Sequence, residues 1–182
     1  MQRIRRCWGT AMLMFMSLAV TGLMTANVVV AAGASPGNAC ELLTLKDVQS
    51  ILGSGFVSRQ DIPLAGQTPT MSNCAYGESA NDSKGNGVVI SLQRIVMDSA
   101  QYLKMEQTGI KQQGGGVTVT AVGGLGDGAF YFLGASAQKN PGQFQLHFGK
   151  GTRLVIIAVV TGGKPNIAAA QKLAKIAYSS LK

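Results

Sequence analysis

The chain of 182 residues is poor in the groups that carry out chemistry. It has a single histidine, His147, and only eight carboxylates, which are scattered along the sequence. A metal site usually takes three or four ligands, and one histidine does not supply them. We therefore expect neither a metal nor a cofactor. We also expect His147 to be an ordinary exposed residue on the polar face of a strand.

Charged residues make up only 13% of the chain, which is too few for a coiled coil. Hydrophobic residues reach 46%. This share excludes an intrinsically disordered chain, because such chains combine few apolar residues with many charges. The length allows one domain of ordinary size.

The first 34 residues have the pattern of a signal peptide. Three arginines (Arg3, Arg5 and Arg6) precede an uncharged apolar stretch over residues 11–32, and small residues follow it. Ala32-Gly33-Ala34 has the small-residue form of a cleavage site, which predicts cleavage between Ala34 and Ser35. Val30-Ala31-Ala32 is the alternative cleavage site.

Two other interpretations of this segment stay open. The apolar stretch has 22 residues and is long enough to cross a bilayer, so an uncleaved inner-membrane anchor is one alternative. Lipidation at Cys40 is the other, but the preceding Pro36-Gly37-Asn38-Ala39 does not fit a lipidation signal. We expect an exported protein, periplasmic or secreted, that meets the membrane only if this segment is not cleaved.

Residues 35–182 are expected to form a single domain. Removing the signal takes away three arginines and no acid, so the formal charge falls from +8 to +5. Trp8, the only tryptophan, leaves with the signal, and 21 of the remaining 148 residues are glycine. The remaining lysines and arginines are dispersed and not interleaved with aromatic residues, so we expect no nucleic-acid partner.

Two of the three cysteines belong to the predicted domain. Cys7 lies in the signal, and its removal leaves Cys40 and Cys74. An oxidising compartment favours a disulfide between such a pair. No Cys-x-x-Cys redox motif is present, and a catalytic cysteine would need His147 as its partner.

The pattern of apolar residues predicts an α+β fold. Thr44 and Asp47 have capping-box-like spacing at the start of a helix that Gly53 ends. A middle helix is predicted over residues 100–108, stopped by Gly109, and a C-terminal helix over residues 167–181. Seven strands are predicted over residues 56–62, 72–78, 88–95, 117–122, 129–134, 143–148 and 153–160. Strands in runs imply a mostly antiparallel sheet packed by the N-terminal, middle and C-terminal helices.

Residues 143–160 predict a hairpin around Gly149-Lys150-Gly151. Phe144, Leu146 and Phe148 alternate with polar residues and are expected to face the core. Gln143, Gln145 and His147 are expected to face outward. The continuous apolar run over residues 154–160 predicts a central strand that is covered on both faces.

The glycine-rich run at residues 123–128 could suggest a nucleotide-binding loop. A phosphate cradle needs glycines that lead from a strand into a helix, but a strand is predicted to follow here. We therefore interpret Gly124, Gly126 and Asp127 as a tight structural turn, in which the Asp127 side chain bonds its own backbone.

Three short patterns carry a resemblance to known families. They are Cys40-x-Leu42-Leu43-Thr44-x-x-Asp47-Val48 before Leu52-Gly53, then Asn73-Cys74-x-Tyr76, then Gly124-Leu125-Gly126-Asp127-x-Ala129-Phe130. Together they resemble families of exported bacterial proteins of unknown function, many of them lipoproteins. A similar arrangement occurs in extracellular sensor domains of membrane-bound Ser/Thr kinases. The resemblance implies a compact α+β domain with a Cys40–Cys74 disulfide and a non-catalytic role in the cell envelope.

The sequence therefore favours a non-catalytic, sensor-like domain that binds a small ligand or an envelope protein. It would use a sheet face or the groove between the sheet and the helices. An envelope hydrolase that uses carboxylates such as Asp61, Asp82 or Asp127 for acid–base catalysis is the alternative. A purely structural envelope component is a third hypothesis.

Overall fold

The computed structural model describes residues 37–61, 71–78, 85–112, 116–135, 137 and 144–181. The predicted signal peptide, its cleavage site and the apolar stretch at residues 11–32 lie outside these residues. The helices are α1 (Ala39–Leu42), α2 (Leu45–Leu52), α3 (Ser99–Gln112) and α4 (Ile167–Ser180). The strands are β1 (Phe56–Asp61), β2 (Met71–Glu78), β3 (Gly87–Arg94), β4 (Thr118–Ala121), β5 (Phe130–Leu133), β6 (Phe144–Lys150), β7 (Arg153–Thr161) and β8 (Lys164–Pro165).

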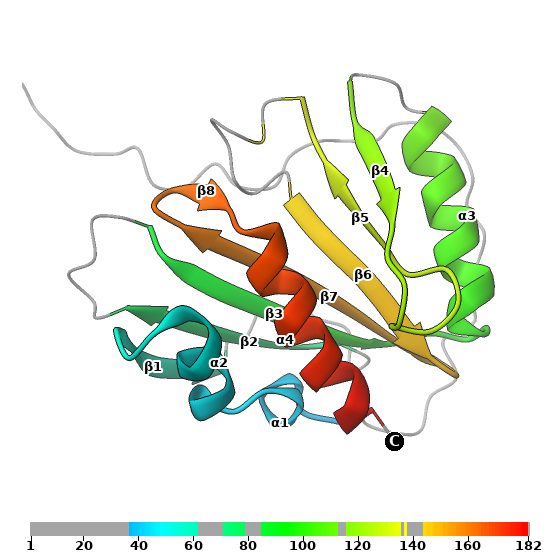
Figure 1. Cartoon of the computed structure of the whole chain (residues 1–182). Coiled ribbons are helices and arrows are strands. Elements are labelled where there is room, and N and C mark those ends of the chain that lie inside the picture. Colours follow the sequence, from blue (N-terminus) through cyan, green and yellow to red (C-terminus); the bar gives the residue numbers. More distant parts are fainter. Residues whose placement is uncertain are drawn as a thin grey trace, which may run out of the picture.

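The described strands form one antiparallel sheet in the order β1-β2-β3-β7-β6-β5-β4, with β8 paired to β7. Two meanders, β1–β3 and β4–β7, meet where β3 pairs with β7 (Figure 1). The predicted α+β class and antiparallel sheet are confirmed. The central position predicted for residues 154–160 is also confirmed, because β7 pairs with both β3 and β6.

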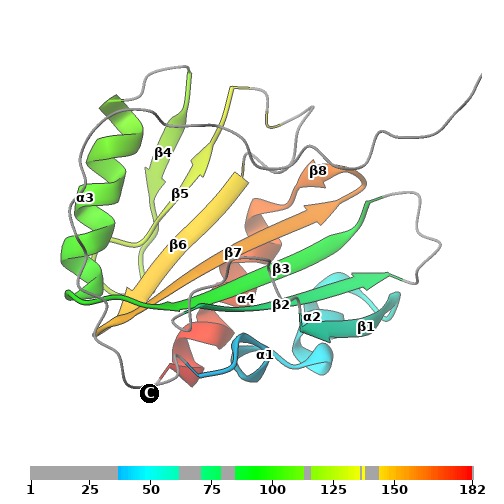
Figure 2. The same cartoon turned by 180° about the vertical axis from the view of Figure 1, so that it is seen from behind.

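Helix α4 crosses one face of the sheet, and α1 and α2 lie beside it; the view from behind shows α4 on the far side of the strands (Figure 2). Leu173, Ala174 and Ala177 of α4 are fully buried. They belong to the main core, together with side chains that alternate along the central strands, such as Phe148 and Ile157. Alanines let the helix approach the sheet closely. Asn166 caps the start of α4, because its Oδ1 accepts a hydrogen bond of 3.0 Å from Ala169 N.

Local sequence signals set the limits of α2. Thr44 Oγ1 accepts a hydrogen bond from Asp47 N, and Asp47 Oδ2 accepts one from Thr44 N, which completes the predicted capping box. Gly53 ends the helix with φ of 100°, a conformation that side chains other than glycine rarely adopt.

Helix α3 packs against the opposite face of the sheet, over β4 and β6. Leu103 is buried there with Phe130 and Leu154, in a second and smaller core. The start of the helix lies directly on the sheet, because Gly149 has no side chain. A Cβ atom at Gly149 would come within 2.5 Å of Ser99 Cβ and 2.6 Å of Arg153 O.

The structure corrects two expected boundaries and adds a helix. Helix α3 continues through Gly109 to Gln112, because Ile110 packs against the second core and this burial offsets the weak helix propensity of glycine. The turn between β6 and β7 is Gly151-Thr152, since Lys150 already pairs with Arg153. The short helix α1 was not expected from the sequence.

Candidate functional site

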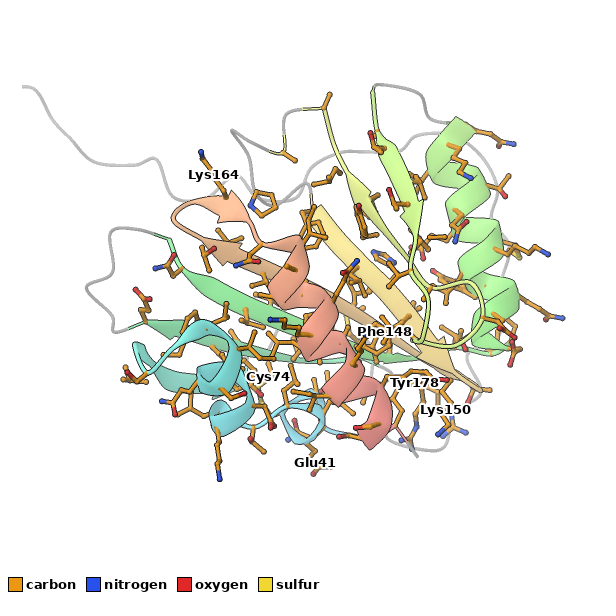
Figure 3. The ribbon with its side chains drawn as sticks, in the orientation of Figure 1. Glu41, Cys74, Phe148, Lys150, Lys164 and Tyr178 are labelled. Atoms are coloured by element: carbon orange, nitrogen blue, oxygen red, sulfur yellow. A yellow bond between two sulfur atoms is a disulfide. The ribbon has the colours of Figure 1, made fainter. Side chains whose placement is uncertain are left out.

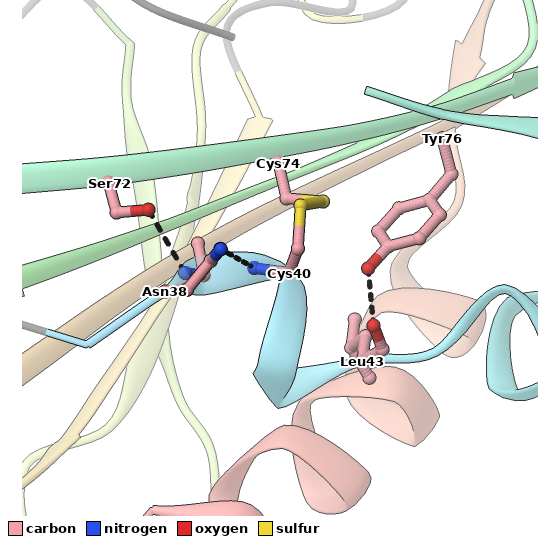
Figure 4. Close-up of a disulfide and its surroundings, with 7 residues drawn as sticks. Asn38, Cys40, Leu43, Ser72, Cys74 and Tyr76 are labelled. Atoms are coloured by element: carbon pink, nitrogen blue, oxygen red, sulfur yellow. Dashed lines mark hydrogen bonds between the residues drawn. A yellow bond between two sulfur atoms is a disulfide. The ribbon is translucent and has the colours of Figure 1, made fainter. Parts of the chain in front are cut away.

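A disulfide holds the short helix α1 against strand β2. Cys40 of α1 is bonded to Cys74 of β2, with their Cα atoms 5.1 Å apart (Figure 4). Both cysteines are almost fully buried. Asn38 caps α1, because its Oδ1 accepts a hydrogen bond of 2.8 Å from Cys40 N. The chain that enters the domain is therefore fixed from its first described residues.

Two further hydrogen bonds join the same segments. Tyr76 Oη donates to the Leu43 carbonyl at the junction of α1 and α2, and Ala39 N donates to Ser72 Oγ over 3.0 Å (Figure 4). Tyr76 and Leu43 are both buried. Four residues of the first two sequence patterns (Cys40, Leu43, Cys74 and Tyr76) thus fasten the N-terminal helices to the sheet.

This fastened corner of the domain contains a recess of about 450 Å³. It lies where α1, the C-terminal end of α4 and the strands β3 and β7 come together. Its lining residues are Gly37, Asn38, Glu41, Leu42, Leu92, Arg153 and Ser180. The volume falls within the range of small-molecule sites, about 300–1,000 Å³.

A row of three cations crosses the sheet beside the recess. Arg94 of β3 and Lys150 of β6 are both direct partners of Arg153 in β7. Directly opposed residues on antiparallel strands present their side chains on the same face, with Cβ atoms about 4.5–5.5 Å apart. Residues two apart in a strand point to the same face, and Leu92 of β3 belongs to the main core beneath α4. The side chain of Arg94 is therefore on the face of the sheet that α4 covers. Three like charges are thus collected at one end of the sheet.

Lys150 is the one cation of this row with a visible partner. Its Nζ donates a hydrogen bond of 3.0 Å to the Leu181 carbonyl at the end of α4 and lies 5.9 Å from the centre of the Tyr178 ring (Figure 3). A cation suits this position because a helix C-terminus carries partial negative charge. Among the described residues the only contact of salt-bridge length joins His147 to Glu106, so no carboxylate lies within that distance of Arg94 or Arg153.

The glycine-rich run forms the connection between the paired strands β4 and β5. Gly124, Gly126 and Gly128 have φ of 78°, 80° and 84°, which favours glycine at each position. Leu125 is fully buried, while the Asp127 side chain is exposed. A Cβ atom at Gly126 would approach Gly149 O to 2.9 Å and Tyr178 Oη to 3.1 Å. The run therefore packs tightly against the end of α4.

The carboxylates considered for acid–base catalysis are not gathered by the described structure. Asp61 lies in β1, at one edge of the sheet, and Asp127 follows β4, at the other edge. Asp82 lies outside the described residues. Within the part of the chain that the structure describes, no cluster of three histidine, cysteine or carboxylate side chains could hold a metal ion.

The expectation that His147 is exposed is wrong, because only 2% of the surface of this residue is accessible to solvent. Its ring stacks on Phe130 with centroids 5.0 Å apart, and its Nε2 lies 3.0 Å from Gln145 Oε1. Helix α3 covers this face of the sheet, so the alternation in β6 separates two cores and not a core from solvent. No local pattern indicates this cover, because the side chains on the covered face of β6 are polar.

The sequence indicated a sheet face or a groove between the sheet and the helices, but it did not identify the residues of this recess. The turn of the β6–β7 hairpin could have indicated that Lys150 and Arg153 are neighbours. The third cation, Arg94, becomes their neighbour only through the pairing of β3 with β7, which connects distant parts of the chain.

No protein-family model, curated protein or solved structure matches this chain. Within the described residues, no helix has the length and apolar character needed to cross a bilayer.

Proposed function

We propose that this protein is an exported, non-catalytic binding domain of the cell envelope, similar in role to a sensor domain, with the recess beside Arg153 as its ligand site. The observation that carries the proposal is the recess itself. It combines the half-buried residue Arg153, the polar groups of Asn38 and Ser180, and the apolar side chains of Leu42 and Leu92. Small-molecule sites have this composition, with apolar walls and a few placed polar groups.

The disulfide supports both parts of the proposal. A stable disulfide fits an oxidising compartment outside the cytosol, in agreement with the pattern of residues 1–34. It also rigidifies α1, which supplies Glu41 and Leu42 to the recess. A preorganised site loses less entropy when it binds a ligand.

The intact mass of the protein recovered outside the cytosol tests the export. We expect a product that begins at Ser35 and gains two mass units on reduction of the Cys40–Cys74 bond. A product that keeps Trp8 would instead show that residues 11–32 remain as an anchor.

Binding is tested by titrating the oxidised domain with a library of small polar and apolar fragments and following its backbone amide resonances. We expect the affected amides to cluster at Leu42, Leu92 and Ser180. Fragments that shift no amide of the recess, or that act only elsewhere, would contradict the proposal.

A further inference from the structure

We infer that the recess binds an oxyanion, a carboxylate or phosphate group of a small molecule, with Arg153 as its main contact. This inference rests on the proposed function and specifies the chemistry of its ligand. It starts from Arg94 and Arg153, which lie directly opposite each other on β3 and β7 without a carboxylate partner among the described residues. Like charges in this position repel each other, and a bound anion removes the repulsion.

The side chain that lines the recess is suited to this ligand. A guanidinium presents its N–H donors as a planar fork that matches the two oxygens of a carboxylate or phosphate. Arg153 is half-buried, so its interaction with an anion is less screened by solvent than that of a fully exposed cation. Lys150 already donates a hydrogen bond to the Leu181 carbonyl. It therefore adds positive potential near the recess and does not contact the ligand directly.

The α1 side of the recess gives the ligand an orientation. Glu41 of α1 lines the same recess and carries a negative charge. The oxyanion therefore lies at the β3–β7 side, and the part of the ligand near Glu41 is neutral or cationic. The recess of about 450 Å³ is larger than an inorganic phosphate, which leaves room for an apolar or hydroxylated portion against Leu42 and Leu92.

The experiment compares charged probes with neutral counterparts of similar size on the oxidised domain. The probes are glycerol 3-phosphate against glycerol, and hexanoate against hexanol, with dissociation constants measured from amide shifts. We expect only the anions to bind with measurable affinity, and we expect their affinity to fall when the salt concentration rises from 20 to 200 mM, because salt screens charge.

Four variants separate the recess from general surface charge. Arg153→Gln should weaken anion binding roughly 10- to 100-fold, the range of a charged hydrogen bond. Arg94→Gln should weaken it about two- to fivefold, and Glu41→Gln should strengthen it by a similar factor. Lys164→Gln is the matched control, because it removes an exposed cation at the distant end of the sheet and should change nothing (Figure 3).

Vesicles distinguish a free molecule from a lipid headgroup as the source of the oxyanion. Binding of phosphatidylglycerol vesicles, but not phosphatidylcholine vesicles, that is lost in Arg153→Gln would support the inference with a headgroup as the ligand. Arg153-dependent binding of glycerol 3-phosphate or hexanoate would support it with a free molecule.

Two results overturn the inference. One is equal binding of the neutral and anionic probes at the recess, which would leave the proposed binding function standing. The other is an equal effect of Arg153→Gln and Lys164→Gln in a variant whose amide spectrum shows it to be folded. If no probe of either kind perturbs the recess, the proposed function fails as well.

Discussion

His147 Nδ1 lies 3.0 Å from Glu106 Oε2, and this contact joins the centre of strand β6 to helix α3. The histidine is almost fully buried, while the Glu106 side chain keeps 23% of its surface exposed. The small second core supplies few apolar side chains for α3 to pack on. We therefore expect the polar contact to contribute to the attachment of the helix.

Replacing Glu106 with Ala should lower the free energy of unfolding by about 1–3 kcal/mol, because a buried imidazole nitrogen loses its partner. Glu106→Gln should cost less, since an amide oxygen can still accept a hydrogen bond. Urea unfolding followed by circular dichroism measures both values. Glu41→Ala removes an exposed carboxylate and serves as the control, with a change within about 0.5 kcal/mol. Equal effects of Glu106→Ala and Glu41→Ala would show that the contact between His147 and Glu106 does not stabilise the fold.

Two glycine substitutions should have effects of opposite sign. Gly149→Ala should destabilise the domain by about 1–3 kcal/mol, because the new Cβ atom meets Ser99 and the Arg153 carbonyl at distances that require the backbone to move. Gly109→Ala should stabilise it by about 0.5–1 kcal/mol, because Gly109 lies inside α3 and an added methyl group there would meet only open space. Thermal unfolding of both variants checks the pair, and a stable Gly149→Ala would contradict the close packing of α3 on β6.

Loss of the disulfide should cost about 4 kcal/mol, which is the loop-closure term for a sequence separation of 34 residues. The variant with both Cys40 and Cys74 changed to Ser removes the bond without leaving a free thiol. Its unfolding midpoint is compared with that of the oxidised parent. The parent in reducing agent provides the second comparison, and it should behave like the variant. A loss below about 1 kcal/mol would mean that Tyr76 and the main core hold α1 in place without the bond.

The alkaline limb of the stability curve should depend on Tyr102. Burial, and then the nearby charge of Glu106, raise the pKa of this phenol above its ordinary value of 10.0. The unfolded chain therefore releases the Tyr102 proton at lower pH than the folded protein does. Stability from this residue is fully present below pH 10.0 and is lost as the pH rises toward the folded pKa.

Tyr102→Phe should remove this part of the alkaline destabilisation, as measured by unfolding between pH 8 and 12. Absorbance titration of the phenols gives a second readout, in which Glu106→Gln should lower the pKa of Tyr102. A pKa of Tyr102 at or below 10.0 in the folded protein would refute the argument.

The features that could be predicted from the sequence are those with local causes. Thr44, Asp47 and Gly53 specify α2 because a cap and a glycine terminator act within a few residues. The β6–β7 hairpin follows from the alternation of apolar and polar residues before a glycine-containing turn and the apolar run after it. The Cys40–Cys74 bond follows from the small number of cysteines left after the predicted signal.

The features that could not be predicted depend on packing between distant segments. His147 is buried because α3 lies over its strand. The residues next to His147 in the sequence do not indicate that a helix covers this face. The environment of Arg153 is set by Arg94 on β3, by α1 and by the end of α4. A candidate site that is assembled from four elements leaves no short continuous motif in the sequence.

The sheet order has a consequence for when this protein can fold. Strand β7 lies between β3 and β6 in the sheet, although it follows both of them in the sequence. Strands β3 and β6 belong to two different meanders. Until Arg153–Thr161 has been synthesised, each meander has an unpaired strand edge and lacks the helix α4 that covers it. The sheet and its main core are therefore completed only after β7 and α4 have been synthesised.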